Sequence, residues 1–133
     1  MGIKFQNLMS IANFLDGYEQ ALHPEWNTFL DSGAYTNHVK GKDVITLDFY
    51  IDFLKENNRR FFHCFSLDRI GDREESEHNF QKIKSQNLNV IPIYQRGDTD
   101  VKELIDMLKD NYLVGFGGLA NNMHTNAGRK YLR

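Results

Sequence analysis

The feature of this sequence that most constrains its fold is the alternation of short apolar runs with longer amphipathic stretches. Four apolar runs, at residues 28–30, 61–67, 89–94 and 112–116, are typical of strands and recur about every thirty residues. Strands separated by helices pair in parallel through right-handed crossovers. We therefore expect an α/β protein built from parallel (βα) units, either a doubly wound sheet or part of a barrel.

The helices expected between these strands share apolar residues at three- and four-residue spacings. They cover residues 5–22, 46–56, 73–86 and a stretch that begins at Thr99. The first stops before Pro24, and the second starts from Thr46 as its N-cap. The third is polar, and we expect it to bury only Phe80 and Ile83.

Composition places the chain among ordinary globular proteins. Its 133 residues suit one domain, residues 1–133, and 41% of them are hydrophobic, which is enough for a core. A net charge of −2 argues against a broad basic surface for nucleic acid. Cys64 is the single cysteine, so we expect a buried, inert thiol in a cytoplasmic protein. The sequence predicts no membrane span, and the scattered histidines predict no metal or cofactor site.

Polar residues or glycines follow each predicted strand. They are Asp31, Asp68, Gln95 and the pair Gly117 and Gly118. In either architecture the carboxyl ends of parallel strands carry the site, so these positions are expected to converge. Carboxylates accept from ring N–H and amine groups, an amide pairs with a carbonyl and an N–H, and glycine exposes backbone. This set matches the edge of a guanine-like base.

Each of these residues also has a purely structural interpretation. An aspartate after a strand is often the N-cap of a turn or helix, and Gly-Gly often marks only a tight turn. A glutamine in a loop is usually exposed to solvent. Tyr35 and Tyr94 lie beside the polar positions and could stack on a base, although such rings more often pack between elements. What favours a site is that all of these positions fall on one edge.

The motifs at these positions resemble those of tRNA-guanine transglycosylases. Leu-Asp-Ser-Gly-Ala-Tyr at 30–35 is similar to the family's Asp-Ser-Gly-Gly-Phe segment, and closer to the Asp-Ser-Gly-Ala-Phe form of phage and bacterial relatives that insert 7-deazaguanines into DNA. Ser-Leu-Asp at 66–68, Tyr-Gln-Arg-Gly at 94–97 and Gly-Phe-Gly-Gly-Leu-Ala at 115–120 resemble the segments that follow. The resemblance spans about residues 28–120.

The resemblance implies a TIM-type barrel, of which about four of eight strands are present here, and exchange of guanine for a 7-deazaguanine in tRNA or DNA. It gives Asp31 a catalytic role in base binding and proton handling. It gives base recognition to Asp68, Gln95, Gly117 and Gly118, with Ser32, Tyr35 and Tyr94 beside them.

The resemblance assigns neither the family's nucleophilic aspartate nor its zinc site to a residue of this chain. We therefore expect either a missing C-terminal half or a homo-oligomer whose copies cover the open edges of a half barrel. Three functions remain open. They are a transglycosylase, a non-catalytic binding module for a guanine-like base or nucleotide, and a structural or inhibitory relative with a vestigial pocket.

Overall fold

The computed structural model describes residues 5–17, 22, 26–95 and 101–117. The chain divides into two compact units, a first unit at residues 1–90 and a second unit at residues 91–133. The prediction of one domain over residues 1–133 stays a prediction, and each unit is described by itself.

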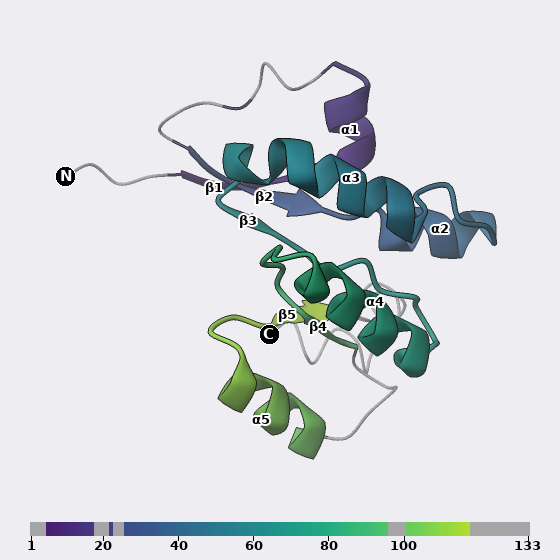
Figure 1. Cartoon of the computed structure of the whole chain (residues 1–133), viewed down its shortest axis with the longest axis vertical. Coiled ribbons are helices and arrows are strands. Elements are labelled where there is room, and N and C mark those ends of the chain that lie inside the picture. Colours follow the sequence, from purple (N-terminus) through teal and green to yellow (C-terminus); the bar gives the residue numbers. More distant parts are fainter. Residues whose placement is uncertain (1–4, 18–21, 23–25, 96–100, 118–133) are drawn as a thin grey trace, which may run out of the picture. The chain divides into compact units, whose positions relative to one another are not determined.

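The first unit contains a parallel sheet in the order β1-β2-β3 (Figure 1). Its strands are β1 (Phe5–Ser10), β2 (Trp26–Asp31) and the short β3 (His63–Cys64). The β1–β2 pairing runs from Phe5 opposite Trp26 to Ser10 opposite Asp31. Beyond β3, the Phe65 N–H donates to the Leu30 carbonyl oxygen, which carries the pairing toward the carboxyl ends of the strands.

The structure contradicts the helix predicted over residues 5–22. Residues 5–10 form strand β1, and among the described residues of that range only α1 (Ile11–Leu15) is helical. Ser10 ends the strand and caps the helix, since its hydroxyl accepts from the Asn13 N–H at 3.1 Å. Adjacent Leu8 and Met9 are 62% and 6% exposed, which is the alternation of a strand. Pairing with β2 satisfies the backbone, and this tertiary contact overrides the helical spacing.

Helices complete the first unit. They are α2 (Ala34–Lys40), α3 (Leu47–Asn57), the 3-10 turn η2 (Asn58–Arg60) and α4 (Arg73–Ser85). Thr46 is confirmed as the N-cap of α3, because its hydroxyl accepts from the Phe49 N–H at 3.2 Å. Phe80 and Ile83 are buried on α4, as predicted, together with Asn79. Helix α2 was not predicted from the sequence.

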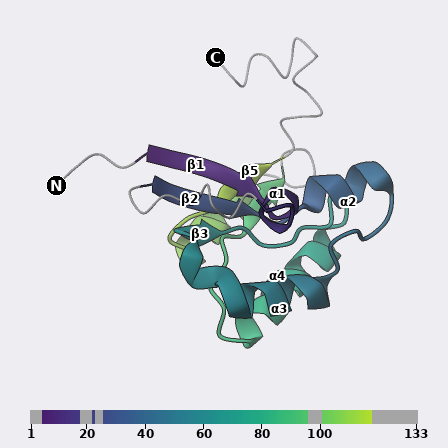
Figure 2. The same ribbon diagram turned by 90° about the horizontal axis from the view of Figure 1, so that it is seen from above.

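The core of the first unit lies between one face of the sheet and the helices. Figures 1 and 2 both show α3 running along that face. Leu30 and Cys64 from the sheet pack in one cluster with Tyr50 and Leu54 of α3 and Ile83 of α4. The prediction that Cys64 is buried is confirmed, and burial raises the pKa of its thiol to about 12.

The second unit is a β-α-β arrangement of β4 (Ile93–Gln95), α5 (Val101–Asp110) and β5 (Gly115–Gly117). The two strands are parallel, with Ile93 opposite Gly115 and Gln95 opposite Gly117. Both strands were predicted, although each is shorter than its apolar run. Helix α5 begins at Val101, and the predicted cap at Thr99 lies outside the described residues.

The α/β class with parallel strands is therefore confirmed, whereas the partial TIM barrel stays a prediction. No helix within the described ranges is both long and apolar enough to cross a membrane.

Candidate functional site

Asp31 occupies the carboxyl end of β2, where the sequence predicted it. The residue is half-buried, and its carboxylate accepts a hydrogen bond from the Gly33 N–H at 3.3 Å. Gly33 has a φ of 88°, in the left-handed region that favours glycine, and it precedes α2. A Cβ at this position would also lie 3.1 Å from the Ile45 side chain. The Asp-Ser-Gly segment is thus a tight turn that directs the chain from strand to helix.

Asp68 lies four residues beyond β3 and is 5% exposed. It lines a cleft of about 230 Å³ between α2 and the loop at residues 68–70. The other walls come from one side of α2 and the residues that follow it, namely Ala34, Asn37, His38, Gly41 and Lys42. A buried carboxylate that borders a cleft can accept hydrogen bonds from a ligand away from the competition of bulk water.

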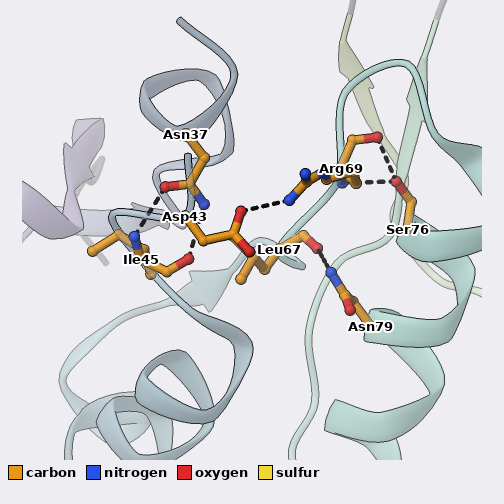
Figure 3. A network of polar contacts seen from close by, with 7 residues as sticks. All are labelled: Asn37, Asp43, Ile45, Leu67, Arg69, Ser76 and Asn79. Carbon is orange, nitrogen blue, oxygen red and sulfur yellow. Dashed lines mark hydrogen bonds and ion pairs between the residues drawn. The ribbon is translucent and has the colours of Figure 1, made fainter. Parts of the chain in front are cut away.

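The backbone on both sides of Asp68 is fixed by α4, as Figure 3 shows. The buried side-chain amide of Asn79 donates to the Leu67 carbonyl oxygen at 2.9 Å. The hydroxyl of Ser76 accepts from the Arg69 N–H at 2.8 Å. Two consecutive turns of one helix therefore hold the residues before and after Asp68, which restricts the directions its side chain can take.

Two hydroxyl groups are buried at the ends of β2 and β3. Ser32 is 1% exposed and Ser66 is fully buried, and neither hydroxyl has a hydrogen-bond partner within the described part of the chain. Nearby, the Tyr50 hydroxyl donates to the Phe65 carbonyl oxygen at 2.5 Å. Burial raises the pKa of Tyr50 well above its ordinary value, and the charges of Cys64 and Asp31 add to this.

Gln95 and Gly117 face each other across the β4–β5 pair of the second unit. A Cβ at position 117 would lie only 2.6 Å from Oε1 of Gln95. The glutamine amide therefore rests against glycine backbone, and a larger residue there would force it to move. Gly118 lies outside the described residues.

The two predicted aromatic positions differ in exposure. Tyr35, on α2, is exposed, and its ring centroid lies 6.5 Å from that of His38. Tyr94 is buried on β4 and packs against Phe116, with ring centroids 5.2 Å apart. Tyr35 is accessible for stacking, whereas the Tyr94 ring is engaged with its neighbour on β5.

The structure brings the predicted residues together in two groups. Asp31, Ser32 and Asp68 lie at the carboxyl ends of neighbouring strands in the first unit, and Gln95 and Gly117 are paired in the second. Because the groups belong to different units, their convergence on one pocket stays a prediction. The first unit also adds basic side chains that the sequence analysis missed, since the cleft is lined by His38, Lys42 and Arg69 as well.

No group of three or more metal-ligating side chains occurs among the residues that the structure describes. The chemistry offered by the cleft is that of a buried hydrogen-bond acceptor beside exposed cationic donors. Comparisons with protein-family models, with curated proteins and with solved structures find no match to this chain.

Proposed function

We propose that this chain recognises a guanine-like base, with Asp68 as the residue that reads the base edge, as part of a transglycosylase-like base exchange on tRNA or DNA. The observation that carries the proposal is the buried Asp68 carboxylate, which borders a cleft while α4 fixes the backbone on both sides of it.

The preference for guanine follows from the pattern of donors on the base. Guanine presents the N1–H and the exocyclic amine side by side, and a carboxylate accepts from both. Adenine has an acceptor at N1, so this atom would face the Asp68 oxygens with no hydrogen between them to form a hydrogen bond. Each unmet buried group costs on the order of 1–3 kcal/mol, so discrimination of about tenfold or more per contact is expected.

The other predicted residues take roles around this contact. Asp31, at the end of the neighbouring strand, would bind the base and handle a proton during exchange. Gln95, resting on Gly117, would pair with the carbonyl side of the base, as the resemblance implies. The order of these residues along the chain is that of the family it resembles.

A non-catalytic binding module is the second candidate. The hydrogen bond from Gly33 to Asp31 favours it, because a carboxylate that serves a turn is less available for proton transfer. Incubation with labelled guanine and either tRNA or DNA separates the two candidates. Incorporation that disappears in Asp31→Asn supports the transglycosylase, whereas base binding without incorporation supports the module.

Calorimetry with guanine, a 7-deazaguanine and adenine tests recognition itself. We expect guanine and the deazaguanine to bind at least tenfold more tightly than adenine, and Asp68→Asn to remove this difference, because an amide places a donor against the N1–H. Asp52→Asn is the matched control, since Asp52 lies exposed on α3 and does not line the cleft. Equal or absent binding of the three bases would refute the proposal.

A further inference from the structure

The cleft beside Asp68 is lined by two chemically different kinds of side chain. Asp68 is a buried carboxyl group, whereas His38, Lys42 and Arg69 are exposed along the same cleft. The side chain of Arg69 is 52% exposed. A ligand that matches such a lining carries both hydrogen-bond donors and anionic oxygens.

Arg69 is held in place by the network shown in Figure 3. Its Nη1 donates to Asp43 at 2.5 Å, and its backbone N–H is bonded to Ser76. A guanidinium carries five N–H donors in a planar fork, so the contact through Nη1 leaves the group able to donate to a second anion. The ion pair with Asp43 therefore orients the guanidinium as well as offsetting its charge.

Lys42 is carried by a segment that is itself anchored. The Asn37 amide donates to the Ile45 carbonyl oxygen at 2.8 Å and accepts from the Ile45 N–H at 2.9 Å. These two bonds close the turn that contains Gly41 and Lys42 against α2 (Figure 3). His38 lies one residue beyond Asn37 on the same helix, so the backbone at both His38 and Lys42 is held by hydrogen bonds nearby.

We propose that His38, Lys42 and Arg69 form a subsite for the phosphate of a guanine nucleotide, as a monoester or as a phosphodiester of a nucleic-acid strand. The inference rests on the proposed recognition of guanine by Asp68 and adds a phosphate contact, with named residues, to that base contact. The base donates to the buried Asp68 carboxyl group, and the phosphate accepts from the exposed donors.

Among the exposed donors, Asp43 offsets Arg69, which leaves the charge of Lys42 to attract a phosphate. The Asp68 carboxyl group lines the same cleft, so the cleft as a whole is not strongly positive. Contacts of exposed charges contribute up to about fivefold each in affinity, and salt screens them. The preference for a phosphorylated ligand should therefore weaken as the ionic strength rises, whereas the preference for guanine over adenine should not.

Affinities of the full chain for guanine, guanosine, guanosine monophosphate, adenosine monophosphate and a short single strand containing one guanine test the subsite. At low ionic strength, we expect guanosine monophosphate to bind about fivefold or more tightly than guanosine. The single-stranded nucleic acid distinguishes the two sources of phosphate, because it binds more tightly than guanosine only if the subsite accepts a phosphodiester. Lys42→Ala should remove most of the gain without changing the affinity for guanine.

Lys40→Ala is the matched control, since it removes the same charge from the same end of α2 but from a residue that does not line the cleft. Thermal melting of both variants verifies that the fold is retained. Guanine binding without any gain from phosphate would overturn the subsite and leave the proposed function standing. Equal losses in Lys40→Ala and Lys42→Ala would also overturn it. Equal affinities for guanosine monophosphate and adenosine monophosphate, with the gain of guanosine monophosphate over guanosine retained, would support the subsite and refute recognition of guanine.

Discussion

The two units of this chain use the same β-α-β pattern with different results. In the first unit, the helices bury apolar side chains against a three-stranded sheet and share one continuous core. In the second unit, α5 has a strongly amphipathic sequence but carries no buried residue, and Val101, Ile105 and Leu108 are exposed. An apolar stripe at helical spacing therefore identifies a helix without indicating that a core covers it.

The candidate site residues are divided between these two units, and their surroundings differ in the same way. Asp68 lies in the unit with the larger core, and two hydrogen bonds from a packed helix hold its neighbours. Gln95 and Gly117 lie on a two-stranded pair. A two-stranded sheet with little buried surface is only marginally stable by itself. The comparison thus predicts that stability resides in the first unit.

The largest expected effect on stability comes from truncating a buried isoleucine of the first unit, compared with an exposed isoleucine of the second. Ile83→Ala should lower the free energy of unfolding by about 2–5 kcal/mol, because Ile83 on α4 is fully buried and its truncation leaves a cavity. Ile105→Ala makes the same change on α5, where the residue is 50% exposed, and should cost less than about 0.5 kcal/mol. Urea denaturation followed by circular dichroism measures both. Similar losses would show that α5 is covered by a core in solution.

Alkaline pH should destabilise the first unit through its buried thiol. Burial raises the pKa of Cys64 from 9.0 to about 12, so above pH 9 the folded chain binds more protons than the unfolded chain. The stabilisation is complete below pH 9 and is lost as the pH rises toward 12, at up to about 1.4 kcal/mol per pH unit. The slope of unfolding free energy against pH should decrease in Cys64→Ala. An unchanged slope would assign the loss to other groups, such as Tyr50.

A smaller effect is expected at the N-cap of α3. Thr46→Ala removes the acceptor for the Phe49 N–H and should cost about 1 kcal/mol. Thr46→Ser keeps the acceptor and is the control, so most of the stability should return. Thermal melting compares the three proteins, and an equal loss in the serine variant would point to packing of the threonine methyl group.

The smallest effect concerns the ion pair between Asp43 and Arg69. Both side chains are about half exposed, so Asp43→Asn should change stability by less than about 1 kcal/mol. The same change also bears on phosphate affinity, because it frees the Arg69 guanidinium from its ion pair and at the same time removes the group that orients it. Added salt should reduce any stability difference, and a loss that is insensitive to salt would contradict a surface ion pair.

The sequence predicted those elements whose local signals agree with their tertiary contacts. Thr46 before an apolar stripe identified α3, and the polar pattern with Phe80 and Ile83 identified α4. Strand β1 was missed because its apolar residues fit a helical spacing, and only pairing with residues 26–31 makes it a strand. Helix α2 was missed because it is short and starts from a glycine in the left-handed region, which local propensity does not indicate.

The candidate site was predictable for those residues that lie at or just after the carboxyl ends of strands. Asp31 and Asp68 follow neighbouring parallel strands, and Gln95 lies beside Gly117, as the order of elements required. The cationic wall of the cleft was not predictable, since it depends on α2 and on the turn that Asn37 closes onto Ile45. The hydrogen bonds from α4 to the backbone around Asp68 could not be predicted for the same reason. In the sequence, Ser76 and Asn79 are ordinary helix residues, and their role depends on the loop after β3 packing against the helix.

The most direct test of the central claim is an amide chemical-shift titration of the full chain with guanine. The account predicts saturable shifts at residues 67–70, and at residues 31–33 of the neighbouring strand end, with much smaller shifts on the exposed face of α5. These shifts should disappear in Asp68→Asn and persist in the Asp52→Asn control. Shifts that leave residues 67–70 unchanged, or that are the same for adenine as for guanine, would contradict recognition of the base by Asp68.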